Sequence, residues 1–236
     1  MTQYENYERS QGWAELAFGT FTAREAGYFA KEMASLDTGP PKSGSCRILE
    51  IGFGNGAFMG WCRVNGIPCD GLEINPVQIA KAKEGGFVAF ASFDEIGDSS
   101  YDLVVGFDIL EHVESTELAA FLGNVKDVCR PGSAMIFRFP NGDNPFSLWM
   151  QNGDVTHRNF IGSGMISQAS TLAGLTLKRV SEPATALDSL SIIARVKIVL
   201  GLWLRQLVGR FLIALFMSGQ KNIRFSPNLL VELRKD

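Results

Sequence analysis

The residues best suited to chemistry begin with a glycine-rich stretch near residue 50. Arg47–Gly56 reads Arg-Ile-Leu-Glu-Ile-Gly-Phe-Gly-Asn-Gly, an apolar run that ends in Gly52, Gly54 and Gly56. Glycine at alternate positions lets a ligand approach the backbone closely and permits turns that need a positive φ. The stretch predicts a buried strand that turns into a helix and offers backbone N–H groups to a nucleotide-like ligand at the carboxyl edge of a parallel sheet.

Two ligand classes fit these glycines. Gly52, Gly54 and Ala57 match the dinucleotide fingerprint G-x-G-x-x-G/A, which is a weak signal when it stands alone. The second pattern places an acid two residues before the first glycine, and Glu50 supplies that acid. A carboxylate inside the loop attracts an ammonium group and repels a pyrophosphate. Glu50 therefore favours the second pattern.

The run Glu50-Ile-Gly-Phe-Gly-Asn-Gly resembles motif I of the class I S-adenosylmethionine-dependent methyltransferases. Three later segments resemble that family in the same order: the strand that ends at Glu73, the Asp-Leu-Val…Asp-Ile-Leu-Glu-His run over 102–112, and the Arg-Pro-Gly-Ser turn at 130–133. Together they cover residues 46–141. The resemblance implies S-adenosylmethionine as cofactor and S-adenosylhomocysteine as product, with the glycine loop packed against the methionine part.

The same resemblance implies roles for the acidic residues. Glu50 would help to hold the cofactor's amino group, and Glu73 would accept hydrogen bonds from the ribose hydroxyls. Asp108 opens the segment that forms the wall of the active site in this family. The adenine contact falls within residues 92–94, where the ring of Phe93 either stacks on adenine or belongs to the core.

Two histidines complete the candidate chemistry, His112 and His157. His157 follows the fifth expected strand, where this fold lines the acceptor pocket, and its ordinary pKa suits a general base. We predict His157 as the catalytic base; the alternative is a histidine that only bonds backbone within its loop. Asp108-x-x-Glu111-His112 resembles, with Asp in place of Glu, a metal set suggested in ubiquinone-pathway O-methyltransferases. Because of that substitution we assign no metal.

Composition narrows the class of protein. The 236 residues, 46% of them hydrophobic, are enough for one large α/β domain. The four cysteines form no C-x-x-C pair, which favours reduced thiols in a cytoplasmic protein, and the polar Met1–Arg9 predicts no secretory signal. The acidic body, with no Asn-Pro-Pro-Tyr-like motif after the fourth strand, argues against nucleic acid as a partner.

Helical segments alternate with short apolar strands, which predicts a Rossmann-like, seven-stranded, doubly wound sheet. Expected strands cover 47–51, 68–73, 87–91, 102–107, 133–139, 175–180 and 229–233, and the resemblance implies that the last one is antiparallel. Expected helices cover 56–65, 76–84, 115–129 and 163–173, and a further helix should begin within 108–113. Residues 1–45 are assigned to an N-terminal helical cap and linker, with Thr22 and Glu25 as a capping box, and 46–236 to the methyltransferase domain.

Residues 189–218 form a helical insertion before the last strand. At 100° per residue, one face holds Arg195, Arg205, Gln206 and Arg210, and the other holds Val196, Val199, Leu200, Trp203, Leu207 and Phe211. No uncharged stretch reaches the ~18 residues of a membrane span. The chain from 189 onward carries net charge +6 and the remainder −9. We expect one or two helices on an anionic membrane surface, at the inner face of the plasma membrane, or else a lid or dimer face.

These observations predict a methyltransferase (EC 2.1.1.-) that O-methylates a hydroxyl of a glycan or lipid-linked saccharide. The acceptor class rests on the basic insertion and on Asp154-Val-Thr-His157, which resembles methyltransferases of surface-glycan (O-antigen or polysaccharide) gene clusters. Three alternatives stay open: a small quinone-like or phenolic acceptor, a non-catalytic cofactor-binding partner in a glycan-synthesis complex, and, least favoured, a dinucleotide oxidoreductase.

Overall fold

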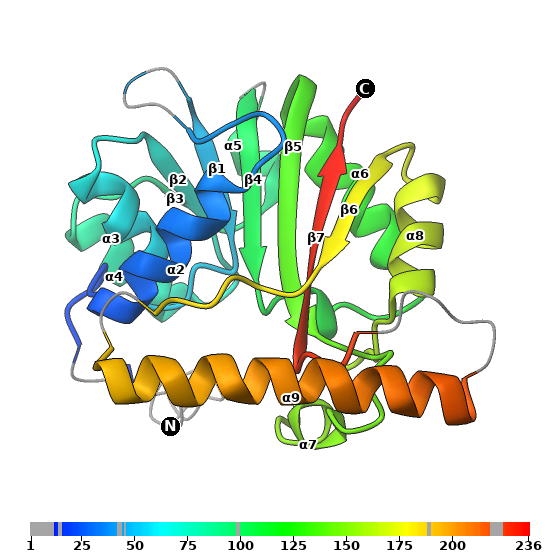
Figure 1. The fold of residues 1–236 in the computed structure, drawn as a ribbon. Helices are drawn as coiled ribbons and strands as arrows, with labels where there is room; N and C mark the ends of the chain where they lie inside the picture. Colours follow the sequence, from blue (N-terminus) through cyan, green and yellow to red (C-terminus); the bar gives the residue numbers. More distant parts are fainter. Residues whose placement is uncertain are drawn as a thin grey trace.

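The computed structural model describes residues 12–13, 16–41, 44, 46–97, 100–187, 190–217 and 224–236. Seven strands form one sheet: β1 (Ile48–Ile51), β2 (Cys69–Leu72), β3 (Ala89–Phe90), β4 (Tyr101–Phe107), β5 (Cys129–Pro140), β6 (Thr176–Ser181) and β7 (Asn228–Arg234). Their order is β3-β2-β1-β4-β5-β7-β6 (Figure 1). β1 to β5 pair in parallel, and β7 lies antiparallel between β5 and β6. This arrangement confirms the predicted Rossmann-like, doubly wound sheet.

Helices connect the strands and cover both faces of the sheet (Figure 1). They are α2 (Ala23–Ala34), α3 (Ala57–Val64), α4 (Pro76–Glu84), α5 (Phe93–Ile96), the 3₁₀ turn η1 (Leu110–His112), α6 (Leu118–Asp127), α7 (Leu148–Gln151), α8 (Ser163–Leu172) and α9 (Ile192–Phe216). α2 starts with the predicted capping box, in which the Glu25 N–H donates to Thr22 Oγ1 at 3.2 Å and the Thr22 N–H donates to Glu25 Oε2 at 2.7 Å.

One expectation about local structure was wrong, and two short helices were missed. The helix expected to begin within 108–113 is only the single turn η1: Asp108, with φ 58°, cannot begin a right-handed helix, and Val113 leaves η1 in extended backbone. The short helices α5 and α7 were not predicted, since four residues are too few to show a helical apolar period.

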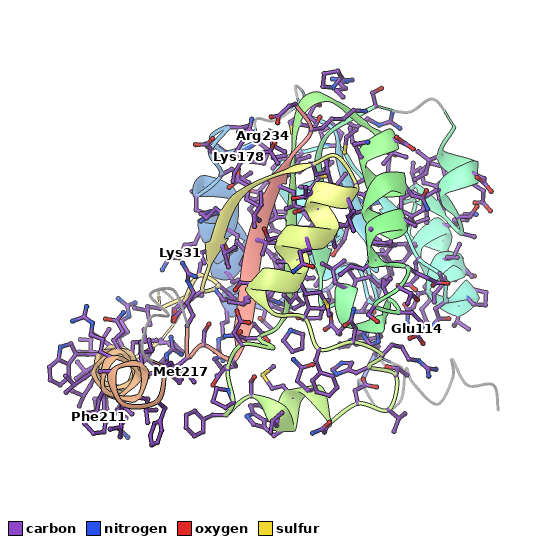
Figure 2. The ribbon with its side chains drawn as sticks, turned by 90° about the vertical axis from the view of Figure 1, so that its right-hand side faces the viewer. Lys31, Glu114, Lys178, Phe211, Met217 and Arg234 are labelled. Atoms are coloured by element: carbon purple, nitrogen blue, oxygen red, sulfur yellow. The ribbon has the colours of Figure 1, made fainter. Side chains whose placement is uncertain are left out.

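The predicted insertion is one helix, α9, which lies along the edge of the molecule (Figure 1). By length and composition, α9 is long and apolar enough to cross a membrane. Its charged residues therefore do not by themselves exclude a membrane span, contrary to our expectation. The predicted division of faces also needs correction. Arg205 and Arg210 were expected on one polar face, but the Arg205 guanidinium turns to the body and pairs with Glu182, whereas Arg210 is exposed. Seen along the axis of α9, Phe211 points away from the sheet (Figure 2).

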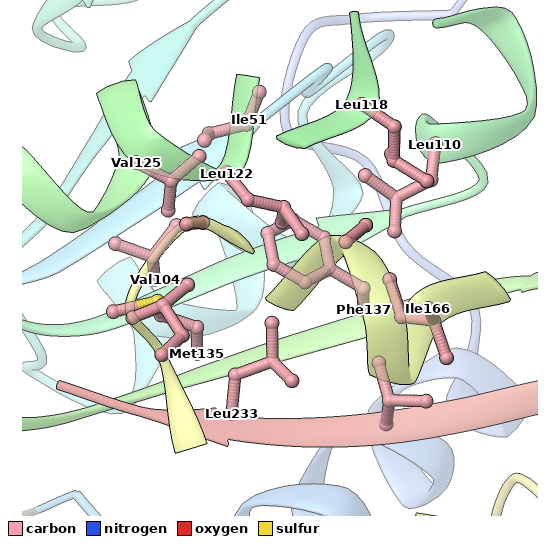
Figure 3. Close-up of a cluster of buried hydrophobic side chains, with 14 of the residues drawn as sticks. Ile51, Val104, Leu110, Leu118, Leu122, Val125, Met135, Phe137, Ile166 and Leu233 are labelled. Carbon is pink, nitrogen blue, oxygen red and sulfur yellow. The ribbon is translucent and has the colours of Figure 1, made fainter. Parts of the chain in front are cut away.

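One face of the sheet packs against α6 and α8 (Figure 3). Phe137 of β5 is fully buried there, with Met135 beside it on the same strand. Leu122 and Val125 of α6 and Ile166 of α8 close this core from the helix side, and all three are fully buried. Long side chains at a strand-to-helix contact remove the most apolar surface from water, so this core holds α6 and α8 in place.

The opposite face packs against α2 and α3. Phe29 and Met33 of α2 meet Phe58 and Trp61 of α3, and this cluster covers Ile136 of β5. The Phe29 and Phe58 rings lie edge to face at 5.2 Å between centroids. Because successive side chains of a strand point to opposite faces, β5 contributes to both cores, which explains why its middle reads as a continuous apolar run.

Replacing Phe137 with alanine should lower the free energy of unfolding by ~3–5 kcal/mol, because the ring is fully buried and its loss leaves a cavity. Urea denaturation measures the change. Phe160→Ala is the matched control, since that ring is 53% exposed and its loss should cost less than ~1 kcal/mol. Equal losses in the two variants would contradict the assignment of Phe137 to the core.

Candidate active site

The glycine loop after β1 forms the predicted turn into α3. Gly52, Gly54 and Gly56 have φ values of 70°, 50° and 71°, all in the left-handed region that favours glycine. A Cβ at Gly52 would also lie 2.9 Å from a side-chain carbon of Ile109. Both the backbone conformation and the available space therefore require glycine at the start of this loop.

Two aromatic rings from the N-terminal segment lie over the same loop. A Cβ at Gly54 would meet the Trp13 ring at 2.7 Å, and a Cβ at Gly56 would meet the Phe18 ring at 2.2 Å. Phe18 is itself held edge-on by Phe53, with 5.5 Å between ring centroids. The N-terminal segment thus covers the glycine loop and shields it from solvent.

Glu73 ties this loop to the end of β2. Its Oε2 accepts a hydrogen bond from the Gly54 N–H at 3.1 Å, while its Oε1 accepts from the N–H groups of Ile74 and Asn75 at 2.8 and 3.0 Å. A carboxylate has about four acceptor positions, so lone pairs are left for a diol. The position beside the glycine loop fits the predicted ribose role of Glu73.

Glu50 lies inside β1 and is 4% exposed. Burial raises the pKa of its carboxyl group well above the usual range, and the nearby Glu73 adds to the rise. Its Oε2 finds no hydrogen-bond partner within the described part of the chain. A buried acceptor without a donor is costly, and an ammonium group placed beside it would satisfy it. This orphaned oxygen fits the predicted contact with the cofactor's amino group.

Asp108 and Phe93 have partners within the protein. The Asp108 carboxylate accepts from Arg138 Nε at 3.1 Å and also pairs with the second guanidinium nitrogen, Nη2. Burial alone would lower the pKa of Arg138, but Asp108 beside it raises it, so the guanidinium stays charged. The Phe93 ring packs edge-on against Phe121, with 5.9 Å between centroids. Cofactor contact by Asp108 and Phe93 stays a prediction.

The two histidines, far apart in the sequence, meet at the carboxyl edge of the sheet. Their ring centroids are 5.0 Å apart. His157 Nδ1 lies 2.9 Å from the Gln151 carbonyl oxygen, and His112 Nδ1 lies 3.2 Å from the Thr156 carbonyl oxygen. A carbonyl only accepts, so each Nδ1 carries the proton and donates it. In the neutral form of each ring, Nε2 is then the acceptor nitrogen.

Glu111 completes this cluster. The ligand atoms of Glu111, His112 and His157 all lie within 4.8 Å of one another. Glu111 is 2% exposed, its Oε2 has no hydrogen-bond partner among the residues described, and burial raises its pKa to about 8. Burial also lowers the pKa of His112. Two imidazole nitrogens and a carboxylate can accept a proton or hold a divalent cation.

The structure therefore brings together a different donor set from the one the sequence suggested. Asp108 faces Arg138 rather than Glu111 and His112, and His157 takes its place in the cluster. The sequence did not single out Arg138, although an arginine at the end of an apolar strand run is an unusual choice that signals a buried partner. The catalytic role of His157 stays a prediction.

The chain belongs to the methyltransferase domain family, which matches residues 13–180. Similar solved structures include a SAM-dependent methyltransferase from Archaeoglobus fulgidus, with TM-score 0.64 and 19% identity over 99% of this chain and 100% of that one. A putative sarcosine dimethylglycine methyltransferase from Galdieria sulphuraria has TM-score 0.59 and 18% identity over 99% and 98% of the chains. The cyclopropane synthase MmaA2 from Mycobacterium tuberculosis has TM-score 0.58 and 16% identity over 94% and 87%.

No curated protein matches the chain. The likenesses to solved structures show the fold, and the family match shows the activity: the protein is an S-adenosylmethionine-dependent methyltransferase (EC 2.1.1.-). Its cofactor is S-adenosylmethionine.

Replacing Glu73 with alanine should weaken binding of S-adenosylhomocysteine by ~1–3 kcal/mol, because the ribose hydroxyls and the Gly54 N–H lose their acceptor. Calorimetric titration measures the dissociation constant. Glu84→Ala removes the same charge from the exposed end of α4 and should leave binding unchanged. An unaltered dissociation constant in Glu73→Ala would exclude the ribose role.

Glu111 should make stability fall with rising pH. Its pKa is about 8 in the folded protein and near the usual 4.5 when unfolded, so unfolding releases a proton between these values. The free energy of unfolding of the wild type, relative to Glu111→Gln, should drop by up to ~1.4 kcal/mol per pH unit from pH 5 to 8 and then level off. Urea denaturation across this range tests it. Glu114→Gln, at an exposed position, should reproduce the wild-type slope.

Proposed function

We propose that the protein O-methylates a hydroxyl carried by a glycan or lipid-linked saccharide. The observation that carries this proposal is the oriented histidine pair: a hydroxyl must lose a proton when it is methylated, and the contact of His157 Nδ1 with the Gln151 carbonyl leaves Nε2 as the acceptor nitrogen of the neutral ring. S-adenosylmethionine, when bound, supplies a sulfonium methyl group. The remaining work of the protein is to place the acceptor, exclude water and take the hydroxyl proton.

His157 takes that proton at Nε2. As the ring becomes an imidazolium, its Nδ1–H remains bonded to the Gln151 carbonyl, which stabilises the positive charge and keeps the ring in one orientation. The Thr156 carbonyl fixes His112 in the same way, and the Arg158 N–H holds the loop to η1 through the Glu111 carbonyl at 2.7 Å. The base is thus positioned by backbone groups before the acceptor arrives.

Ile109 lies between the glycine loop and the segment that carries the histidine pair. Ile109, next to η1, packs against Gly52 of the glycine loop. The loops that follow β1, β4 and β5 all leave the same edge of the parallel sheet, which brings the glycine loop, η1 and the His157 loop together there. This juxtaposition supports methyl transfer between a cofactor on one side of Ile109 and an acceptor on the other.

Support for a lipid-linked acceptor comes from the surface beside His157. Gln151, which orients His157, belongs to α7, and Leu148 and Trp149 of the same helix are 55% and 69% exposed. A saccharide held on a lipid would reach His157 from this apolar side while its hydrocarbon part stays in a bilayer. We place the protein in the cytoplasm, at the inner face of the membrane.

The same donor set favours a second candidate function. Glu111, His112 and His157 form a carboxylate and two-histidine group of the kind that binds divalent cations, and such an ion would lower the pKa of a coordinated phenol. O-methylation of a small phenolic or quinone-like acceptor would then depend on metal and not on lipid.

Replacing His157 with glutamine should reduce methyl transfer by ~10²–10⁴-fold while leaving S-adenosylhomocysteine affinity unchanged. The measurement follows label from methyl-labelled S-adenosylmethionine into a lipid-linked oligosaccharide fraction, with catechol as the phenolic comparison. Val155→Ala, at a 97% exposed position in the same loop, is the control and should keep full activity. Full activity in His157→Gln would refute the base assignment. Labelling of catechol alone, abolished by EDTA, would establish the second function instead.

A further inference from the structure

The outward side of α9 is a continuous apolar surface. Twelve large hydrophobic side chains of this helix are at least 46% exposed: Ile192, Ile193, Val196, Val199, Leu200, Trp203, Leu204, Leu207, Val208, Phe211, Leu215 and Phe216. A helix of 25 residues is about 37 Å long at 1.5 Å per residue, so the surface runs along a large part of the molecule. Monomeric soluble proteins rarely expose so large an apolar patch without a partner.

The inward side of α9 is fixed to the body. Gly209 is buried, and a Cβ there would lie 2.7 Å from the Phe225 ring. Arg205 pairs with Glu182, which follows β6. The Ser191 hydroxyl accepts from the Ala194 N–H at 3.3 Å and caps the first turn. These contacts set the rotation of the helix about its axis. The side chains of Val196, Val199, Leu200, Trp203, Leu207 and Phe211 then point outward.

α7 adds a second apolar patch at the same edge. Phe146, Leu148 and Trp149 are 64%, 55% and 69% exposed. The Phe146 ring lies 6.1 Å from that of Phe225, the residue against which Gly209 packs, so the two patches are neighbours. In Figure 2, α9, seen end-on, and α7 both lie at the lower end of the molecule. Together they form what we call the apolar edge, defined by residues 146–149 and 192–216.

Charge complementarity indicates what covers the apolar edge. α9 carries four cationic residues and neither Asp nor Glu. At 100° per residue, the exposed Arg210 and Lys197 lie on opposite sides of Leu207, with Arg210 between Val199 and Trp203 and Lys197 beside Leu204. Trp203 and Trp149 supply the amphipathic rings that favour a lipid–water interface. Cations on both sides of an apolar stripe suit anionic lipid headgroups above their acyl chains.

The chain connections decide between lying on the bilayer and crossing it. α9 is joined to β6 at one end and to β7 at the other, and β6 and β7 are neighbouring strands of one sheet. A spanning helix would put its two ends on opposite sides of a ~30 Å hydrocarbon layer. Both ends of α9 instead return to the same body, which fits a helix that lies in the plane of the interface.

We propose that the apolar edge docks the protein on an anionic lipid bilayer, with α9 in the membrane plane and the aromatic side chains of α7 inserted beside it. The docking does not depend on the identity of the methyl acceptor.

Flotation of the full chain tests the docking, with vesicles of equal phosphatidylglycerol and phosphatidylcholine compared with phosphatidylcholine alone. The wild type should bind the anionic vesicles more tightly. Leu200→Ser/Leu207→Ser/Phe211→Ser should bind at least ~100-fold more weakly, because the apolar stripe is lost. Val64→Ser/Val88→Ser/Leu172→Ser removes three apolar groups that are at least 52% exposed and lie outside the apolar edge, and this variant should bind like the wild type. Circular dichroism checks that all variants are folded.

Two further experiments test the contribution of the cationic side chains and distinguish an interfacial helix from a spanning one. Lys197→Gln/Arg210→Gln should lower the affinity for anionic vesicles ~25-fold, about fivefold per cation, with little effect on phosphatidylcholine. Alkaline carbonate should release the bound protein, as expected for a helix in the interface. Failure of the wild type to float, wild-type binding by the Leu200→Ser triple variant, or resistance to carbonate would each overturn the proposal. So would a dimer in sedimentation that the same triple variant abolishes, because a second copy would then occupy the surface.

Discussion

The left-handed backbone of the glycine loop is the constraint on which the active site depends. A side chain at Gly52 would collide with Ile109, and the loop could not then pass close to the η1 segment that carries Glu111 and His112. The same turn brings the Gly54 N–H to the Glu73 carboxylate and so joins the first two strands at their carboxyl ends. The glycine loop is therefore fixed against η1 by Ile109 and against the end of β2 by Glu73, and both contacts require the glycine backbone.

Much of the sheet could be predicted from the sequence because its signals are local. Each of these signals spans only a few residues: the apolar run before Gly52, the Asn75-Pro76 helix start and the Thr22 capping box. Buried parallel strands also read as unbroken apolar runs, so their positions needed no knowledge of their partners. The antiparallel direction of the last strand came from the resemblance to a family rather than from periodicity.

The site was less predictable because its contacts join residues distant in the chain. Nothing in the sequence shows that Asp108 would turn to Arg138 while His157 reached His112, since both choices depend on where β5 and its following loop end. The inward placement of Arg205 was missed for a related reason. A helical projection gives the angles between side chains, but the Phe225 ring and Glu182 decide which angle meets the body.

The placement of α9 between β6 and β7 also makes it a replaceable module. Ser181 of β6 lies opposite Leu230 of β7, so the sheet needs only a reversal of chain direction at this point. A turn that joins β6 to the segment 224–227 would close the two strands into an antiparallel hairpin. It would keep Leu229 in the core and the hydrogen bonds from Asn141 and Asn144 to the carbonyls of 224–226. The membrane-docking surface that we propose is thus carried by a segment that the pairing of β6 with β7 does not require.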